Sequence, residues 1–381
     1  MTTWDDNTIR RASFDYRLLF VVVLLTGLGL TMVFSASAVL AQERFGDGLY
    51  YLKRAAFYAA IGFIFMNIFM RIPYFYWKRF VYPLLALCIA LSGLTLFSGL
   101  GESIGGARRW LKFGPMTLQT SELTKIAIVL FMAYSLEKKN LKMEKFSVGI
   151  LPHVAITGVL IVLVLAGKDL GSSVVMGATI FLMLFLGGAN LKHLLYLFLS
   201  TLPFLYFLIA REGYRLQRIL SFLNPWDDRL GSGFQIIQSF LAFNEGGFFG
   251  KGLGAGQQKL FYLPEAHTDF IFSVLGEELG LIGVFLTIIF FLFLTFRGIR
   301  IGRLAPDLFG KFLALGIIIL ISVQSILNMG VVMGLLPTKG LVLPFIGYGG
   351  SSLVTSLMAI GILLNVSTYQ QSDTPALFGN K

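Results

Sequence analysis

The chain has 381 residues, of which 56% are hydrophobic and only 13% are charged. A soluble protein of this length would carry roughly twice that charged fraction. The composition therefore excludes a soluble domain and predicts an integral membrane protein. In such a protein the formal net charge of +11 indicates basic cytoplasmic loops, and not a nucleic-acid partner. The three histidines, His153, His193 and His267, lack the spacing of a metal site.

The N-terminal segment, residues 1–17, is polar and is expected to form a cytoplasmic tail. The apolar run that follows is longer than the core of a cleavable signal peptide. Although Ser35-Ala36-Ser37-Ala38 resembles a cleavage site, its depth inside that run predicts a retained membrane helix.

The apolar runs predict an all-α, polytopic membrane protein with about ten transmembrane helices. Each run is long enough to cross a hydrocarbon core of about 30 Å. No repeat or linker divides the chain, so residues 18–366 are expected to form one membrane domain and 367–381 a cytoplasmic tail. The predicted spans lie at about 18–40, 55–72, 79–98, 118–135, 148–166, 172–189, 192–210, 270–296, 310–334 and 342–366.

The short loops indicate an orientation in the membrane. Basic residues in cytoplasmic loops set the topology of such proteins. They cluster in the N-terminal tail and in the turns after the second, fourth and eighth spans, which places both termini in the cytoplasm. These residues are Arg10, Arg11 and Arg17, then Arg71, Lys78 and Arg79, then Lys138, Lys139, Lys142 and Lys145, then Arg297, Arg300, Arg303 and Lys311.

Two segments on the predicted outer side are also basic. One is 99–117, with Arg108 and Arg109, and the other is a large external loop at about 211–269, between the seventh and eighth spans. Within that loop Arg215 and Arg218 would share one face of a helix, and arginine donors suit phosphate oxygens. Lys259 adds a further charge. An anionic ligand at the outer face is the simplest reason for these cations.

Asp269 ends the external loop and directly precedes the eighth span. Burial there would raise its pKa, and the nearby cations would lower it. A carboxylate balanced in this way suits a general base. An N-cap of the following helix is the alternative, and the sequence leaves both interpretations open.

Other ionisable residues lie at membrane depth, where charge is costly and often functional. Glu122 and Lys125 in the fourth span are three residues apart and would equally form an internal ion pair. Glu277 and Glu278 in the eighth span have the same two interpretations. Asp169, between the fifth and sixth spans, is a functional candidate, an N-cap, or a partner of Lys168. These alternatives remain open on sequence alone.

Small residues near the C-terminus interrupt the last apolar run. Segment 336–352 contains Pro337, Gly340, Pro344 and several further glycines. Small residues allow close helix packing, and they also suit a broken helix that lines a cavity.

Several of these segments, in this order, resemble the SEDS family of cell-shape and division proteins. The resemblance spans nearly the whole chain, and it favours the division branch over the elongation branch. It rests on Gly106-Ala107-Arg108-Arg109-Trp110, Gln119 to Lys125, Asp169-Leu170-Gly171, the Tyr214 to Asp269 loop, Gly276-Glu277-Glu278-Leu279-Gly280, and Pro337 to Ser352.

The resemblance implies an inverting glycosyltransferase that polymerises lipid II, a lipid-linked disaccharide, into peptidoglycan at the outer face of the cytoplasmic membrane. It implies Asp269 as the catalytic base. We expect the diphosphate leaving group to be neutralised by Arg108, Arg109, Lys125, Arg215 and Arg218. Supporting roles are expected for Glu122, Asp169, Lys259, Glu277 and Glu278.

The resemblance also implies partners and a location. The partners are lipid II with the growing lipid-linked glycan chain, a class B penicillin-binding protein that crosslinks the product, and other membrane proteins of the division complex. The expected location is the division septum. No organic cofactor or resident metal is implied, and a divalent cation remains an open requirement.

Three alternatives compete with this hypothesis. A lipid II flippase would also need many spans and intramembrane charge, although it would not concentrate its polar groups towards one face. A polymerase of the elongation branch would differ in cellular role. A scaffold without catalysis would leave the external cations and carboxylate unexplained.

Overall fold

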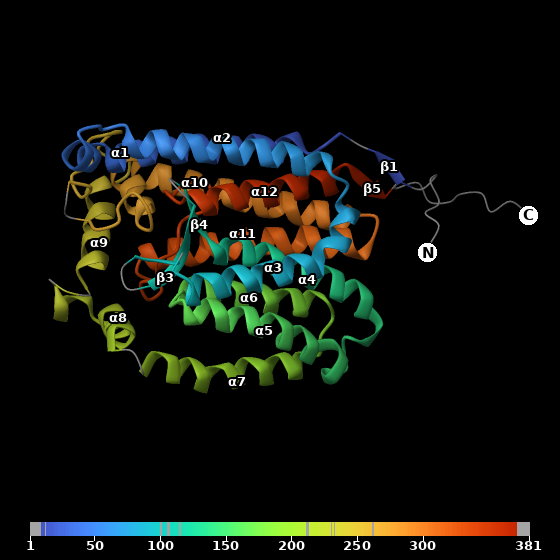
Figure 1. Cartoon of the computed structure of the whole chain (residues 1–381). Coiled ribbons are helices and arrows are strands. Elements are labelled where there is room, and N and C mark those ends of the chain that lie inside the picture. The colour runs from blue at the N-terminus through green and yellow to red at the C-terminus, as the bar shows by residue number, and fades with distance from the viewer. Residues whose placement is uncertain are drawn as a thin grey trace, which may run out of the picture.

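In a computed structural model the chain folds as a long bundle of helices (Figure 1). The structure describes residues 9–11, 13–99, 101–104, 107–113, 116–210, 213–229, 231, 233–260 and 263–371. The long helices of this part are α1 Tyr16–Phe45, α2 Tyr50–Arg71, α3 Trp77–Phe97, α4 Thr120–Lys139, α5 Leu151–Ala166, α6 Leu170–Leu186, α7 Leu191–Ala210, α10 Ile271–Leu304, α11 Leu308–Val332 and α12 Gly350–Ser367.

These helices coincide with the predicted spans to within a few residues at most boundaries, although α12 begins eight residues later than expected. Counting short one-turn extensions, seven helical stretches in the described part are long and apolar enough to cross a membrane. Two further apolar helices, Leu170–Leu186 and Leu191–Phe204, are shorter, and α4 carries several charges. The polytopic helical fold is therefore confirmed, while the number of ten crossings stays a prediction.

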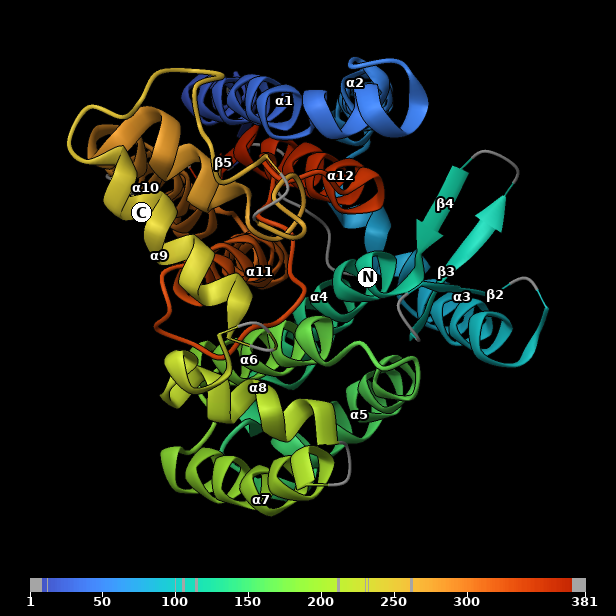
Figure 2. The same ribbon diagram turned by 90° about the vertical axis from the view of Figure 1, so that its left-hand side faces the viewer.

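The bundle has two distinct ends. Short strands β1 Ile9–Arg11 and β5 Tyr369–Gln371 pair antiparallel at one end, which we call the terminal end. The opposite end, which we call the loop end, carries α8 Gly213–Leu223 and α9 Phe234–Gly246. These two helices run across the bundle axis and not along it (Figures 1 and 2). Both tails thus begin on the same side.

Carboxylates in the connecting turns define where several helices begin. Asp15 accepts a hydrogen bond from the Leu18 amide (3.1 Å) at the start of α1. Asp307 does the same for Gly310 (2.8 Å) at the start of α11. Such N-caps satisfy amides that lack partners inside the helix.

Helices α4, α11 and α12 form the centre of the bundle. Apolar windows of α11 and α12 are 72% and 78% buried, against 22–44% for the other membrane-length helices. Helix α7 lies at the periphery (Figure 2), where it exposes large apolar side chains such as Tyr196, Phe198 and Phe204. Exposed apolar surface of this kind suits contact with lipid, as expected for a membrane bundle.

Two small sheets were not predicted. Besides the β1–β5 pair, the basic segment after α3 folds into three antiparallel strands, β2 Gly101–Ile104, β3 Ala107–Phe113 and β4 Met116–Gln119, in the order β2-β3-β4. Helices still dominate, so the all-α class holds. The sheet matters because it orients the two arginines of β3 differently.

Helix α10 is broken near its start. Gly280 has φ of 65° and ψ of −165°, which only glycine adopts readily. The glycine-rich turn after α9 replaces the lost helical contacts: the Leu281 amide donates to the Gly247 carbonyl (2.9 Å), and the Lys251 amide donates to the Glu277 carbonyl (3.0 Å). Shorter turns of helix complete the described part at Tyr74–Tyr76, Asn140–Lys142, Phe146–Ile150 and Pro225–Asp228.

Candidate functional site

Asp269 lies at the loop end, in the turn that leads into α10, and its side chain is partly buried. Burial raises the pKa of Asp269 to about 7. The negative charge of Glu265 adds to this rise, while Arg109 and Arg218 act in the opposite direction. The N-cap alternative is wrong, because Phe270 is the N-cap residue and no side chain caps this end of α10. The carboxylate is therefore held at a pKa that suits a proton acceptor at neutral pH.

Hydrogen bonds from a side chain of α11 hold the turn that carries Asp269. The Asn328 side-chain amide, on α11, donates to the Asp269 carbonyl (2.9 Å) and to the Leu341 carbonyl (2.5 Å). A β-carbon on Gly340 would lie 3.0 Å from Oδ2 of Asp269. The absence of a side chain at Gly340 thus lets the segment between α11 and α12 pass directly against the carboxylate.

Asp169 and Arg109 form a second charged group on the same side of the fold. Asp169 is 2% exposed and caps α6 through the Ser172 amide (3.1 Å). It also accepts hydrogen bonds from Ser121 (2.9 Å) and from Gln119 (3.1 Å). Arg109 lies 3.9 Å from this carboxylate. The N-cap interpretation of Asp169 is thus confirmed. The cation that lies beside Asp169 is Arg109, and not Lys168.

Two of the predicted external arginines, Arg108 and Arg109, point in different directions. Arg109 donates to the Lys168 carbonyl (2.6 Å), whereas Arg108 points to the Leu96 carbonyl at the end of α3 (3.3 Å). Neighbouring residues of a strand face opposite sides of a sheet, which explains this divergence. Arg218 approaches the Thr338 carbonyl (3.5 Å). Arg215 lies in α8 as predicted, but its side chain is outside the described part of the structure.

Lys339 is a cation of segment 336–352 to which the sequence analysis gave no role. It precedes Gly340, where a β-carbon would lie 3.0 Å from Oδ2 of Asp269, and burial lowers the pKa of its amine. Among the described residues no carboxylate pairs with it. A partly buried amine without a carboxylate partner is a candidate for binding an anion.

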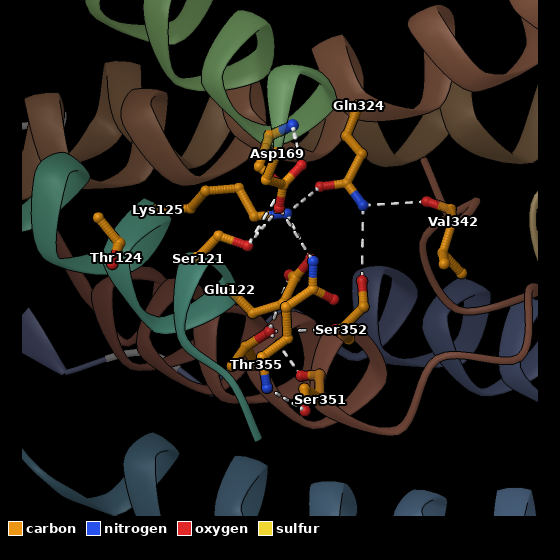
Figure 3. A network of polar contacts seen from close by, with 12 residues as sticks. Ser121, Glu122, Thr124, Lys125, Asp169, Gln324, Val342, Ser351, Ser352 and Thr355 are labelled. Atoms are coloured by element: carbon orange, nitrogen blue, oxygen red, sulfur yellow. Dashed lines mark hydrogen bonds and ion pairs between the residues drawn. The ribbon is translucent and has the colours of Figure 1, made fainter. Parts of the chain in front are cut away.

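Lys125 and Glu122 belong to a buried polar network inside the bundle (Figure 3). Lys125 is 2% exposed and contacts Glu122 (2.8 Å) and the Gln324 side-chain oxygen (2.7 Å). The Gln324 side-chain nitrogen donates to the Val342 carbonyl (3.0 Å). The predicted internal ion pair is therefore present. Through Gln324 it supports the segment that passes Asp269.

Glu277, Glu278 and Lys259 fasten the loop between α9 and α10 to α10. Both glutamates are fully buried. Glu277 accepts from the Gln257 amide (2.6 Å), and Glu278 binds Lys259 (2.5 Å) and Ser35 of α1 (2.6 Å). Here too the ion-pair alternative is present. Lys259 is 5% exposed, so its charge is already balanced.

Two residues that shape the site were missed by the sequence analysis. Gln324 and Asn328 are polar residues four apart in an apolar run, so they share one face of α11. Polar side chains at membrane depth are a usable signal. As for metals, the described residues contain no group of three or more histidine, cysteine or carboxylate side chains that could hold an ion.

Comparisons with known proteins agree with this architecture. The family model described as cell cycle protein, FtsW/RodA/SpoVE, matches residues 16–372. The chain belongs to this family. A probable peptidoglycan glycosyltransferase FtsW from Geobacter metallireducens is 52% identical over 362 residues, covering 95% of this chain and 96% of the relative.

A more distant relative and two solved structures extend the likeness. The stage V sporulation protein E of Bacillus subtilis is 44% identical and covers 96% of this chain and all of the relative. A chain from a structure that describes polymerization and crosslinking by a peptidoglycan synthase complex matches with a TM-score of 0.77 and 29% identity, over 93% and 97% of the two chains. The rod-shape determining protein RodA of Thermus thermophilus matches with a TM-score of 0.68 and 26% identity, over 93% and 96%.

Proposed function

We propose that this chain is a peptidoglycan glycosyltransferase that polymerises lipid II into glycan strands at the outer face of the cytoplasmic membrane, during cell division. The observation that carries the proposal is a partly buried carboxylate, Asp269, with a pKa of about 7, at one end of a membrane bundle and within the electrostatic reach of two arginines. Relatives about half identical over almost the whole chain are named as peptidoglycan glycosyltransferases of the FtsW type.

Asp269 acts as the general base in this proposal. The attacking hydroxyl of one sugar transfers its proton to the carboxylate while its oxygen forms a bond to the anomeric carbon of the second, lipid-linked sugar. The bond from that carbon to the diphosphate breaks, and configuration inverts. Because diphosphate leaves readily once its charge is neutralised, a single base and a set of cations suffice.

Arg109, Arg218 and Lys339 are the cations that we propose for the diphosphate. The first two are close enough to Asp269 to influence its pKa, and Lys339 precedes Gly340, where a β-carbon would crowd the Asp269 carboxylate. We also predict that Arg215 binds the diphosphate. Lys125 and Lys259 sit in buried ion pairs, so we assign them, with Glu122, Asp169, Glu277 and Glu278, to holding the site in shape. Arg108 contacts the end of α3 and is expected to matter less.

The proposal includes an orientation and partners. The loop end faces outward and both termini are cytoplasmic, in line with the basic turns at the terminal end. A class B penicillin-binding protein crosslinks the product, other division proteins assemble with the pair, and the complex works at the septum. The likeness to a chain of a peptidoglycan synthase complex supports such a partnership.

Substitution of the base tests the proposal. Asp269→Asn keeps the size of the side chain but removes the proton acceptor, and general-base catalysis contributes roughly 10²–10⁴-fold. We expect polymerisation of purified lipid II, in the presence of the partner, to fall by a factor in that range. Asp227→Asn makes the same change on an exposed carboxylate of the same loop and should leave the rate unchanged.

Two results would contradict the proposal. One is an Asp269→Asn protein that polymerises at the wild-type rate. The other is a wild-type complex that moves lipid II across the bilayer of reconstituted vesicles and makes no glycan, which is the outcome expected of a flippase.

A further inference from the structure

A pair of neighbouring hollows lies between α1 and α10, at the terminal end and far from Asp269. The two helices run side by side there (Figure 2). The first hollow is an apolar groove formed by exposed and half-buried side chains of both helices. Its lining includes Phe20 and Val23 from α1 and Ile289, Phe290 and Phe293 from α10.

The second hollow is polar and adjoins the first. Tyr16 lines both, so the two hollows meet at this side chain. The polar hollow is formed by the start of α1, the last turns of α10 and the end of α12. Its lining includes Asp15, Arg297, Arg300, Ser367 and Tyr369.

The charge of the two hollows is positive. Asp15 is balanced by Arg297, whose Nε lies 2.9 Å from its carboxylate. Arg17, which lines the apolar groove, donates to the Tyr16 hydroxyl (3.4 Å), lies over the face of its ring and forms no ion pair with a described residue. Arg300 is exposed and forms no ion pair with any described residue. Three arginines against one carboxylate leave a net charge of +2.

We propose that these hollows bind one anionic phospholipid, with an acyl chain in the apolar groove and the phosphate at Arg17 and Arg300. The order of the surfaces matches such a lipid: apolar side chains lie towards the middle of the bundle, and the Tyr16 ring with the guanidinium groups of Arg17 and Arg300 lies towards the terminal end. Tyrosine favours the membrane–water boundary, and basic pockets between membrane helices bind anionic lipid head groups.

The bound lipid would join α1 and α10. Arg297 already links α10 to Asp15 at the start of α1, and the Asp15 amide donates to Ser367 at the end of α12 (3.0 Å). A phosphate bound beside this junction would add a further link between α1 and α10 at the membrane surface. The inference needs no catalysis and is independent of the proposed function.

Native mass spectrometry of the purified full-length protein tests the proposal. Phosphatidylglycerol and phosphatidylcholine with identical acyl chains are added in turn. We expect one phosphatidylglycerol to be retained and phosphatidylcholine to bind at least roughly tenfold more weakly, since a single charge-assisted contact to phosphate contributes about that factor. Equal retention of the two lipids would overturn the proposal.

Three variants distinguish a specific lipid-binding site from a general electrostatic attraction of anionic lipids to the basic end of the protein. Replacing Arg17 and Arg300 together with Gln should weaken phosphatidylglycerol binding at least roughly tenfold. The matched double variant, Arg71→Gln with Arg79→Gln, removes the same charge from the α2–α3 turn at the same end and should have no effect. Ile289→Trp fills the apolar groove without changing charge and should also weaken binding.

Other outcomes would overturn the proposal as clearly. If the Arg71 and Arg79 variant lost as much affinity as the Arg17 and Arg300 variant, the attraction would be general. If Ile289→Trp bound normally, no acyl chain would occupy the groove. A photo-crosslinking group placed at Phe293 that captured a protein helix in cells, and no lipid, would identify the surface as a protein interface.

Discussion

At the scale of single residues, the environment of Asp269 decides how the site responds to pH. Burial and the negative Glu265 favour the neutral acid, and Arg109 and Arg218 favour the carboxylate. With a pKa of about 7, the base is only partly ionised in neutral solution. The ionised form of Asp269 is therefore needed for activity, and it also lowers the stability of the folded protein.

We expect the activity of the enzyme to follow the ionisation of this carboxylate. kcat/KM for lipid II should rise about tenfold per pH unit below the pKa and level off above pH 7, because only the charged form accepts a proton. A profile that stayed flat between pH 5 and 8 in buffers of constant ionic strength would contradict the assignment of about 7.

Stability should change in the opposite direction. The folded protein holds the Asp269 proton more tightly than the unfolded chain, whose aspartates titrate near 3.8. Stability associated with this proton is therefore complete below that value and is lost as pH rises through about 7. Asp269→Asn should raise the melting temperature at pH 8 and leave it unchanged near pH 4.

At the scale of elements, buried ion pairs connect segments that are far apart in the chain. Glu278 joins α10 to Lys259 of the loop between α9 and α10 and to Ser35 of α1. Glu277 holds the Gln257 amide and lies 3.7 Å from Lys251. The break at Gly280 leaves backbone groups that the glycine turn satisfies. The loop before Asp269 is thus anchored at the depth of the second turn of α10.

Breaking one of these pairs should destabilise the protein strongly. Lys259→Met leaves Glu278 buried without its cation, which costs about 3–5 kcal/mol. The double variant Lys259→Met with Glu278→Gln removes both charges and should recover most of that loss. Thermal unfolding in detergent measures both. A single variant as stable as the wild type would show that Lys259 and Glu278 do not pair.

The sequence predicted the elements better than their contacts. Apolar runs located the long helices because their length and composition are local properties. The strands of the segment after α3 were missed, and with them the opposite directions of Arg108 and Arg109. Asn328 and Gln324 were overlooked inside an otherwise apolar run.

The candidate site was predicted only in part, for a related reason. Asp269 was identified from its position at the end of a basic loop, and its raised pKa agrees with that hypothesis. Which cations approach it depends on contacts between residues far apart in the chain, as with Arg109 and Asp269, which are 160 positions apart. Charge pattern alone therefore could not separate Lys125 and Lys259, which are neutralised inside the fold, from Arg109.

At the scale of the whole molecule, the basic turns and the paired tails lie at one end of the bundle and the candidate site lies at the other. This arrangement predicts the membrane topology. Cysteines at Leu223 in α8 and at Leu141 after α4 lie at opposite ends, and these positions are 72% and 97% exposed. The natural cysteine, Cys88, is buried and should not react.

A membrane-impermeant thiol reagent distinguishes the two sides. In intact spheroplasts Leu223→Cys should be labelled and Leu141→Cys should be protected until the membrane is opened, because basic turns stay in the cytoplasm. The reverse pattern would invert the proposed orientation and would exclude Asp269 from chemistry at the outer face.

The pairing of β1 with β5 also means that the chain nearly closes into a ring. Arg11 is registered against Tyr369, so the two ends of the membrane domain meet backbone to backbone. A short peptide joining them, with a new opening at the exposed Leu141 turn on the same side, would permute the order in which the helices are synthesised. If that circularly permuted protein still inserts and folds, the contacts between the helices determine the architecture, and the order in which the helices are synthesised does not.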